Sequence, residues 1–194
     1  SHHFWKAHYP TLQTHFKTQL SATSLSNFYK GINKVEASYI RTESDELHYH
    51  FHILIRYELE KALLEGNLQV AELESVWNEK YKTYLDLDVH DANQGILQDV
   101  HWSYGSIGYF PTYSLGSFYA AQFFQQAQKD IPELDTQIQS GDTSALLHWL
   151  QTHIYQYGRL YSATELCKRI TGEALNFDYF YNYAVEKYSG IYGL

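Results

Sequence analysis

Three side chains that can do chemistry lie close together in the middle of this sequence. Gln98, Asp99 and His101 follow Gly95 and precede Trp102, so an amide, a carboxylate and an imidazole fall within four consecutive positions. A carboxylate next to an imidazole can fix the tautomer of the ring and raise its basicity. The alternative is a structural hydrogen-bond network, because many loops contain the same residue types.

Arg41 is a second candidate, as a group that binds a carboxylate. Its planar guanidinium presents paired N–H donors that match the two oxygens of a carboxylate. The same stretch also has the form of a helix start, with Thr42 or Ser44 as the N-cap and acidic residues in the first turn. Under that interpretation Arg41 is a surface residue.

The eleven histidines raise the question of a metal site. His48 and His52 are four residues apart, the spacing at which two imidazoles on one helix can bind a single zinc ion. Tyr49 follows His48, whereas an H-E-x-x-H site has there the glutamate that activates a metal-bound water. The alternative is a set of solvated or hydrogen-bonded histidines without a metal.

Long helices must position these groups. Residues 44–65 and 70–84 carry apolar residues at steps of three and four, which predicts two amphipathic helices, and Gly66 follows the first as a stop. The expected buried positions are Leu47, Phe51, Leu54, Ile55, Leu59, Ala62 and Leu63 in the first helix, and Val70, Leu73, Val76, Trp77, Tyr81 and Tyr84 in the second.

The segment that follows these helices, residues 86–116, differs from them in composition. Its glycines and aromatic residues predict loops with one short strand over 107–110, and residues 32–42 are a second candidate for a short strand. Helices are expected again from residue 115 to 130 and beyond, with Asp142, Ser162 and Asn176 as N-caps. The predicted fold is mostly α, with a short β element near the loop that carries the candidate site.

Composition excludes several classes of protein. A formal charge of -8 without a cluster of Lys and Arg argues against binding to nucleic acid, because phosphates are bound by cations. The longest apolar runs are far shorter than the roughly 20 residues of a membrane helix. Cys167 is the single cysteine, so no intrachain disulfide forms, and a cytoplasmic location is expected because the first residues do not resemble a secretory signal.

Taken together, these segments resemble the Taq/Pfu-type thermostable metallocarboxypeptidases. Chains of that family carry, in order, H-E-x-x-H, H-E-S-Q, I/H-R-x-x-A-D and G-x-x-Q-D-x-H-W. The third motif is present at residues 40–45, with Ser44 in place of the usual alanine, and the fourth is complete at residues 95–102. The resemblance covers essentially the whole chain, including residues 103–116, 170–173 and 191–194 and the pairs Phe4-Trp5 and Tyr9-Pro10.

The first two motifs, which in the family supply the metal ligands and the general base, are absent from these residues. The resemblance therefore implies that residues 1–194 are one C-terminal fragment, about half, of a larger carboxypeptidase whose H-E-x-x-H part is missing. The aromatic start of the chain, at Phe4 and Trp5, fits a cut inside a longer protein. Zinc or cobalt is expected in the full-length enzyme, no metal is expected in this fragment, and the fragment alone is expected to be inactive.

The resemblance also assigns roles to the candidate residues. Arg41 would bind the substrate carboxylate and Gln98 would contact substrate, with Asp45 and Asp99 as supporting residues. Tyr109 and Tyr113 are candidate donors to the scissile carbonyl oxygen, and His101 is a candidate polar contact in the cleft. The expected partners are peptide C-termini, the missing N-terminal half and a second copy of the protein in a homodimer.

Two alternatives belong to other classes of protein. One is a stand-alone helical interaction module that has lost catalysis, for which nothing would require Arg41 and the motif at 95–102. The other is an independent metalloprotein that uses His48 and His52, which predicts stoichiometric zinc after a chelator wash.

Overall fold

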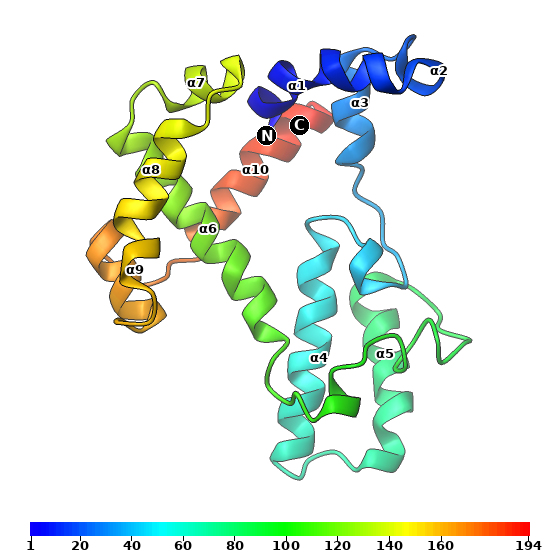
Figure 1. Cartoon of the computed structure of the whole chain (residues 1–194). Helices are drawn as coiled ribbons and strands as arrows, with labels where there is room; N and C mark the ends of the chain where they lie inside the picture. The colour runs from blue at the N-terminus through cyan, green and yellow to red at the C-terminus, as the bar shows by residue number, and fades with distance from the viewer. The chain divides into compact units, whose positions relative to one another are not determined.

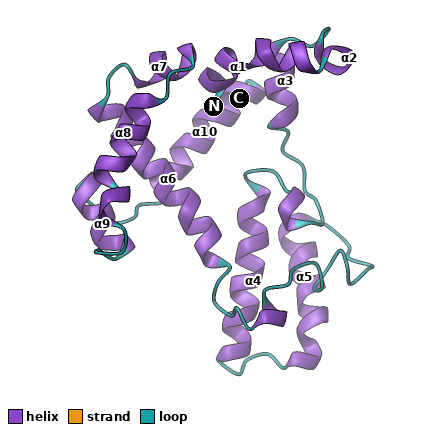
Figure 2. Ribbon diagram, in the orientation of Figure 1, coloured by secondary structure: helices purple, strands orange, loops and turns teal.

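The computed structural model describes residues 1–194, which form ten α-helices and four short 3-10 helices without any strand (Figure 2). The chain divides into two compact units, residues 33–116 and residues 1–32 with 117–194. Along the chain the α-helices are α1 (His2–His15), α2 (Lys17–Leu20), α3 (Leu25–Ile32), α4 (His48–Leu64), α5 (Leu73–Leu85), α6 (Pro111–Asp130), α7 (Leu134–Ser140), α8 (Ser144–His153), α9 (Ala163–Thr171) and α10 (Asp178–Tyr192) (Figure 1). The mostly helical fold is as predicted, and none of these helices is both long and apolar enough to span a membrane.

The unit of residues 33–116 is built on the helix pair α4 and α5, which lie side by side (Figure 1). Their shared core consists of Ile55, Leu59, Leu68, Leu73, Trp77, Tyr81 and Leu85. The rings of Trp77 and Tyr81 stack with centroids 5.1 Å apart. The helical spacing of apolar residues therefore located both helices, although Val70 is 79% exposed rather than buried.

The buried face of α4 is only partly the one that apolar periodicity predicted, because Ile55 and Leu59 are buried as expected but other positions differ. Phe51 and Leu54 are exposed, whereas His52, Arg56 and Glu60 are buried together with Ile53, Ile55 and Leu59. The three polar residues are spaced four apart, so they form one stripe along the helix. A polar stripe is buried only where its groups are paired, and the partners of these three come from elsewhere in the unit.

Both predicted strands are absent. Residues 107–110 form turns, with Gly105 at φ 71 and Gly108 at φ 79, and their backbone groups bond within turns or to a side chain. Residues 34–40 have no regular secondary structure, and side chains bond to their backbone where a neighbouring strand would otherwise pair. The backbone N–H of Glu36 donates to Asp45 Oδ2, and the carbonyl of Tyr39 accepts from Gln98 and Tyr81. Apolar and β-branched residues suggested strands, but no second strand exists to pair with them.

Helix α6 begins at Pro111, four residues before the predicted start at Leu115. Proline suits the first position of a helix, because its fixed φ is helical and its missing N–H is not needed there. Tyr113 and Ser114 consequently lie on the first turn of α6 and not in a loop.

The other unit, residues 1–32 and 117–194, has its own small core. Ala127 from α6, Leu134 and Ile138 from α7 and Trp149 from α8 make up its buried cluster. The indole N–H of Trp149 donates to Asp130 Oδ2 at 2.8 Å, and α1 packs against α7.

Three caps were predicted in this unit. Ser162 and Glu165 form the predicted capping box at the start of α9. Asp142 Oδ1 accepts from Ser144 N, and Asn176 Oδ1 accepts from Asp178 N, so the two predicted caps serve α8 and α10 from just outside each helix.

Candidate functional site

The two sequence motifs meet at Asp99, within the unit of residues 33–116. Arg41 begins a 3-10 turn, is 6% exposed, and donates through Nη2 to Asp99 Oδ1 at 2.7 Å and through Nε at 3.1 Å. The backbone N–H of Arg41 donates to Gln98 Oε1 at 2.8 Å. Residues that are 57 and 58 positions apart in the sequence are thereby joined directly. The interpretation of Arg41 as a surface residue is wrong.

A second arginine binds the same carboxylate. Arg56 of α4 is fully buried, and its Nε and Nη2 each lie 2.7 Å from Asp99 Oδ2. Its Nη1 donates to the carbonyl of His52 at 2.8 Å. The ring of Phe110 lies under both guanidinium groups, 5.6 Å from Arg41 Cζ and 5.3 Å from Arg56 Cζ. These contacts fix both cations in place.

The three side chains Arg41, Asp99 and Arg56 carry one net positive charge between them. Burial alone would raise the pKa of Asp99, but the hydrogen bond from Arg41 and the charge of Arg56 outweigh burial and hold this pKa below its usual value. Burial, followed by the charge of Arg56, lowers the pKa of the neighbouring His52 to about 3. The surroundings of the cluster therefore favour anions over further cations.

Arg41 keeps donors for an additional partner. A guanidinium has five N–H groups. In Arg41 the Nε group and one on Nη2 bond to Asp99, and one on Nη1 donates to Tyr49 Oη at 3.1 Å. One N–H on each terminal nitrogen is left, and such a pair matches the two oxygens of a carboxylate. The rings of Tyr49 and Tyr113 lie 5.8 and 5.1 Å from Arg41 Cζ.

His101 does not pair with Asp99 as the sequence suggested. His101 Nδ1 lies 4.0 Å from Asp99 Oδ1, which is too far for a hydrogen bond, and it is buried without another partner. The oxygens of Asp99 are occupied by the two arginines instead. His101 Nε2 lies 2.9 Å from Tyr113 Oη, so the imidazole is held by α6.

Tyr109 and Tyr113 differ in what their hydroxyl groups do. The two rings meet edge to face with centroids 5.4 Å apart, and both lie 5.8 Å from the ring of His101. Tyr113 Oη is at His101, whereas Tyr109 is 49% exposed and its hydroxyl has no hydrogen-bond partner in the chain. Of the two tyrosines, Tyr109 is therefore the one whose hydroxyl is not engaged by another group of the chain.

Gln98 orders the loop around the site. Its Oε1 accepts from Arg41 N, and its Nε2 is within hydrogen-bond distance of four acceptors: the carbonyls of Tyr39, Gln94 and Gly95 and the hydroxyl of Tyr81. The amide is thus used at both ends inside the unit. Gln98 therefore holds the backbone of Arg41 in place.

Asp45 caps the start of α4. Its Oδ1 accepts from the backbone N–H groups of Leu47 and His48, and its Oδ2 lies 2.6 Å from His48 Nδ1. Burial alone would raise the pKa of Asp45, but these bonds lower it below the usual value. The predicted caps Thr42 and Ser44 are displaced by Asp45, and Ser44 Oγ is buried without a hydrogen-bond partner.

His48 and His52 do not form a metal site in this structure. His52 is fully buried, with Nδ1 3.0 Å from Tyr81 Oη, and His48 is tied to Asp45. No group of three or more His, Cys, Asp or Glu side chains in residues 1–194 is arranged to hold a metal ion. Two imidazoles without a third ligand do not make up a zinc site.

Sequence reasoning missed four residues that build the site, Tyr49, Arg56, Glu60 and Tyr81. Arg56 and Glu60 follow His52 at steps of four on α4, and this spacing was the available signal. A polar stripe next to Ile55 and Leu59 indicates a helix face that is buried against polar partners. Apolar periodicity alone does not detect it.

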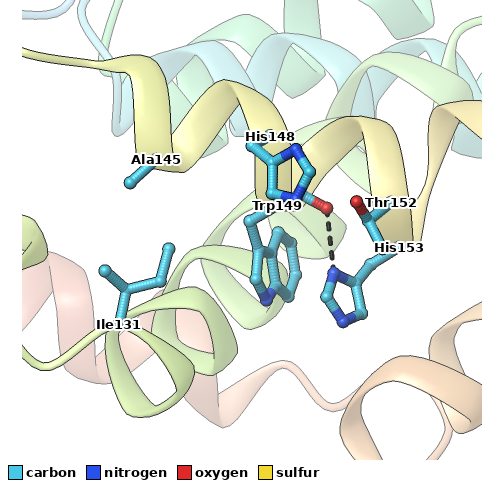
Figure 3. A pocket seen from close by; sticks show the side chains of 6 residues that line it. All are labelled: Ile131, Ala145, His148, Trp149, Thr152 and His153. Carbon is cyan, nitrogen blue, oxygen red and sulfur yellow. Dashed lines mark hydrogen bonds between the residues drawn. The ribbon is translucent and has the colours of Figure 1, made fainter.

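The other unit contains a hollow of about 190 Å³, which Figure 3 shows. It is lined by Ile131, Ala145, His148, Trp149, Thr152 and His153. His153 Nδ1 bonds to the carbonyl of Trp149 on its own helix at 2.9 Å, so the imidazole is committed to the backbone of α8 (Figure 3). None of the predicted site residues lies here, and no pair of acid and base groups faces the space.

Known proteins resemble this chain over nearly its whole length. The family model of the carboxypeptidase Taq (M32) metallopeptidases matches residues 1–188. Carboxypeptidase 1 of Bacillus subtilis (strain 168) is 41% identical over 190 residues, which are 98% of this chain and 38% of that protein. Thermostable carboxypeptidase 1 of Thermus thermophilus is 40% identical over 190 residues, which are 98% of this chain and 37% of that protein.

A solved structure has the same fold. The crystal structure of the M32 carboxypeptidase from Deinococcus radiodurans R1 matches with a TM-score of 0.96 at 36% identity, over 100% of this chain and 39% of that one. The chain thus spans less than two fifths of the length of these relatives, and the expected share of about half was too large.

Proposed function

The chain belongs to the carboxypeptidase Taq (M32) metallopeptidase family, and we propose that it supplies the substrate-binding part of a metal-dependent carboxypeptidase. The proposed reaction is hydrolysis of the last peptide bond of a peptide, which releases single amino acids from the C-terminus. Peptide C-termini are the proposed substrates, because a free α-carboxylate distinguishes them from every internal position of a peptide.

The two remaining N–H groups of Arg41 are the observation that carries this proposal. They lie on a guanidinium that Asp99 and Tyr49 hold in place, in a cluster with one net positive charge, and Gln98 holds the backbone of the same residue. A buried cation that is already oriented loses little entropy when it binds a carboxylate, and the low local dielectric strengthens the bond. Arg41 is therefore assigned to the substrate α-carboxylate.

Tyr109 is assigned as donor to the oxygen of the scissile carbonyl. A tetrahedral intermediate places negative charge on this oxygen, and a positioned hydroxyl stabilises that charge more than it stabilises the neutral carbonyl. His101 and Tyr113 bond to one another beside Tyr109 and form the polar wall of the same site. Gln98, Asp45 and Asp99 are assigned as supporting residues.

The metal of the family is not accommodated by the residues of this chain. No suitable cluster of ligands is present in residues 1–194, so we derive no step that involves a metal. We propose that zinc or cobalt is bound by residues outside this sequence, and that the 194-residue chain alone is inactive. The direct test measures the zinc content of the chain and its hydrolysis of a blocked dipeptide with zinc or cobalt added. Metal-dependent turnover by the chain alone would contradict this assignment.

Arg41 can be tested with pairs of peptides that differ only at the C-terminus. In the protein expressed from its complete reading frame, Arg41→Ala should lower kcat/KM for free C-termini by about 10- to 100-fold, the size of a lost hydrogen bond to a charged group. Amidated peptides, which are poor substrates, should be little affected. Arg41→Lys should also be impaired, because an ammonium lacks the planar pair of donors.

Arg169→Ala is the matched control for these variants. Arg169 packs over Tyr161 in the other unit, with its Cζ 4.0 Å from the ring centroid, and has no assigned role. An equal loss on free and amidated peptides with Arg41→Ala would remove the proposed role of Arg41.

Two further proposals concern the state of the protein. We propose a cytoplasmic homodimer, on the basis of family resemblance and of the single cysteine, Cys167, which is buried. Sedimentation equilibrium of the protein tests the dimer, and a monomer at micromolar concentration would contradict it.

A further inference from the structure

Glu60 is a buried carboxylate that belongs to neither sequence motif. It lies on α4, one turn after Arg56, and is 3% exposed. Its Oε1 accepts from the indole N–H of Trp102 at 2.8 Å, and its Oε2 accepts from the backbone N–H of Gly108 at 3.1 Å. A carboxylate is buried at a considerable free-energy cost unless its oxygens are hydrogen-bonded, so these two bonds account for its presence.

The two bonds fasten both ends of one loop to α4. Trp102 directly follows His101, and Gly108, at φ 79, directly precedes Tyr109. The residues in between have little packing of their own. Tyr104 is 80% exposed and Ile107 is 48% exposed. Among the hydrogen bonds of these residues, the two to Glu60 are therefore the ones that link both ends of the loop, next to His101 and Tyr109, to α4.

Arg41 is held by a different set of contacts. Its partners are Asp99, Gln98 and Tyr49, and none of them bonds to Glu60. Loss of the Glu60 bonds should consequently move the groups that face the scissile carbonyl and leave the group that binds the α-carboxylate in place. This separation gives Glu60 a kinetic signature of its own.

We propose that Glu60 is a positioning residue, which sets the distance of Tyr109 and His101 from the reacting carbonyl by fastening residues 102 and 108 to α4. The inference rests on the proposed carboxypeptidase function. It deepens that function by assigning to α4 the placement of the loop that carries the oxyanion donor.

Glu60→Gln is the sharpest variant, because it keeps the size of the side chain and exchanges one oxygen for an NH2 group. One of the two N–H donors then faces another donor, and the loop must shift to avoid this contact. In the metal-loaded protein from the complete reading frame, kcat should fall by about 10- to 100-fold, the effect of a misplacement of roughly 1 Å. KM for free C-terminal peptides should change less than about twofold, because Arg41 keeps its contacts.

The number of intact binding sites distinguishes a positioning role of Glu60 from a purely structural one. Titration with a free amino acid product, which needs Arg41 and not Tyr109, gives the number of binding sites per protein and their affinity. Unchanged stoichiometry and affinity with a lower kcat support positioning. A loss of binding sites in proportion to kcat would show that Glu60 only stabilises the fold, and would overturn the proposal.

Trp102→Phe provides both a milder variant and a test of rescue. It removes the indole N–H, so in the double variant the amide introduced by Glu60→Gln can turn its NH2 group to the vacated side and accept from Gly108 with its oxygen. Glu60→Gln should therefore cost much less kcat in the Trp102→Phe background than in the wild type. Equal costs in both backgrounds would contradict the assigned hydrogen bonds.

Glu58→Gln is the matched control on the same helix. Glu58 is a partly exposed carboxylate that pairs with Lys80 and Tyr84 and lies outside the site, so kcat should not change. If the wild-type protein with metal has no carboxypeptidase activity, the proposed function and the role of Glu60 are both overturned. If the wild type is active and Glu60→Gln has the same kcat, only the role of Glu60 is overturned.

Discussion

Asp99 Oδ2 lies 2.7 Å from Nη2 of the fully buried Arg56. The other oxygen of the same carboxylate lies 2.7 Å from Nη2 of Arg41. One carboxylate from the loop of residues 86–110 thus neutralises half of the charge of two guanidinium groups. The fold of this unit depends on that carboxylate, because neither cation has another anionic partner among its hydrogen bonds.

Asp99→Asn should destabilise the chain by about 3–5 kcal/mol, because it leaves two buried cations with a neutral partner. Urea unfolding followed by circular dichroism measures the change. Asp88→Asn is the control, since Asp88 pairs with Lys82 on the surface at 2.9 Å, where ion pairs contribute little. Similar unfolding midpoints for the two variants would show that Asp99 does not support the fold in this way.

Ser44→Ala should stabilise the chain by about 1 kcal/mol, because Ser44 Oγ is buried without a hydrogen-bond partner. Alanine also restores the residue that is usual in the motif. Ser162→Ala should have the opposite effect and destabilise by about 1 kcal/mol, since Ser162 Oγ caps α9 through Glu165 N. Thermal unfolding of both variants measures the difference. A loss of stability with Ser44→Ala would indicate that its hydroxyl has a partner.

The sequence was sufficient to place the helices of residues 48–64 and 73–85, because apolar residues at helical spacing make up their shared core. It oriented the first helix only in part, because Ile55 and Leu59 are buried as predicted but Phe51 and Leu54 are exposed. The stripe of His52, Arg56 and Glu60 is buried through bonds to Tyr81, Asp99 and Trp102, which are 29 to 43 residues away in the sequence. Periodicity of apolar residues carries no information about such distant polar partners.

The site shows the same limit. The motifs singled out Arg41 and Asp99, which bond to each other, but local sequence paired Asp99 with its neighbour His101. In the folded chain two arginines bind that carboxylate instead. The ion pair of Arg41 with Asp99 at 2.7 Å is much stronger than the contact of His101 with Asp99 at 4.0 Å. The tertiary structure determines which groups bond to Asp99, so these partners could not be derived from residues 95–102 alone.

Tyr109→Phe and Tyr113→Phe should differ in their effect on catalysis. Tyr109 has an available hydroxyl and is assigned to the oxyanion, so its loss should lower kcat by about 10²- to 10³-fold with little change in KM. Tyr113 bonds to His101 and should have a smaller effect, through the orientation of the imidazole. Steady-state kinetics of both variants with one free C-terminal peptide gives the comparison. A larger loss with Tyr113→Phe would exchange the two assignments.

Protonation of His52 should make the free energy of unfolding depend on pH. Burial and then the charge of Arg56 lower its pKa from 6.5 to about 3, so the unfolded chain binds a proton that the folded chain excludes. The contribution of His52 to the free energy of unfolding is therefore fully present above about pH 6.5. It is lost as the pH falls from there toward 3, by about 1.4 kcal/mol per pH unit. Burial lowers the pKa of His50 in the same direction, so a variant is needed to separate the two.

His52→Gln removes this proton while leaving an amide that can bond to Tyr81, and its unfolding free energy should fall less steeply than that of the wild type between about pH 7 and 5. His15→Gln should keep the full slope, because His15 is exposed at the end of α1. Urea midpoints at several pH values measure these slopes. If wild type and His52→Gln run parallel, the imidazole takes up its proton in the folded chain as readily as in the unfolded one, and the buried stripe on α4 is open to water.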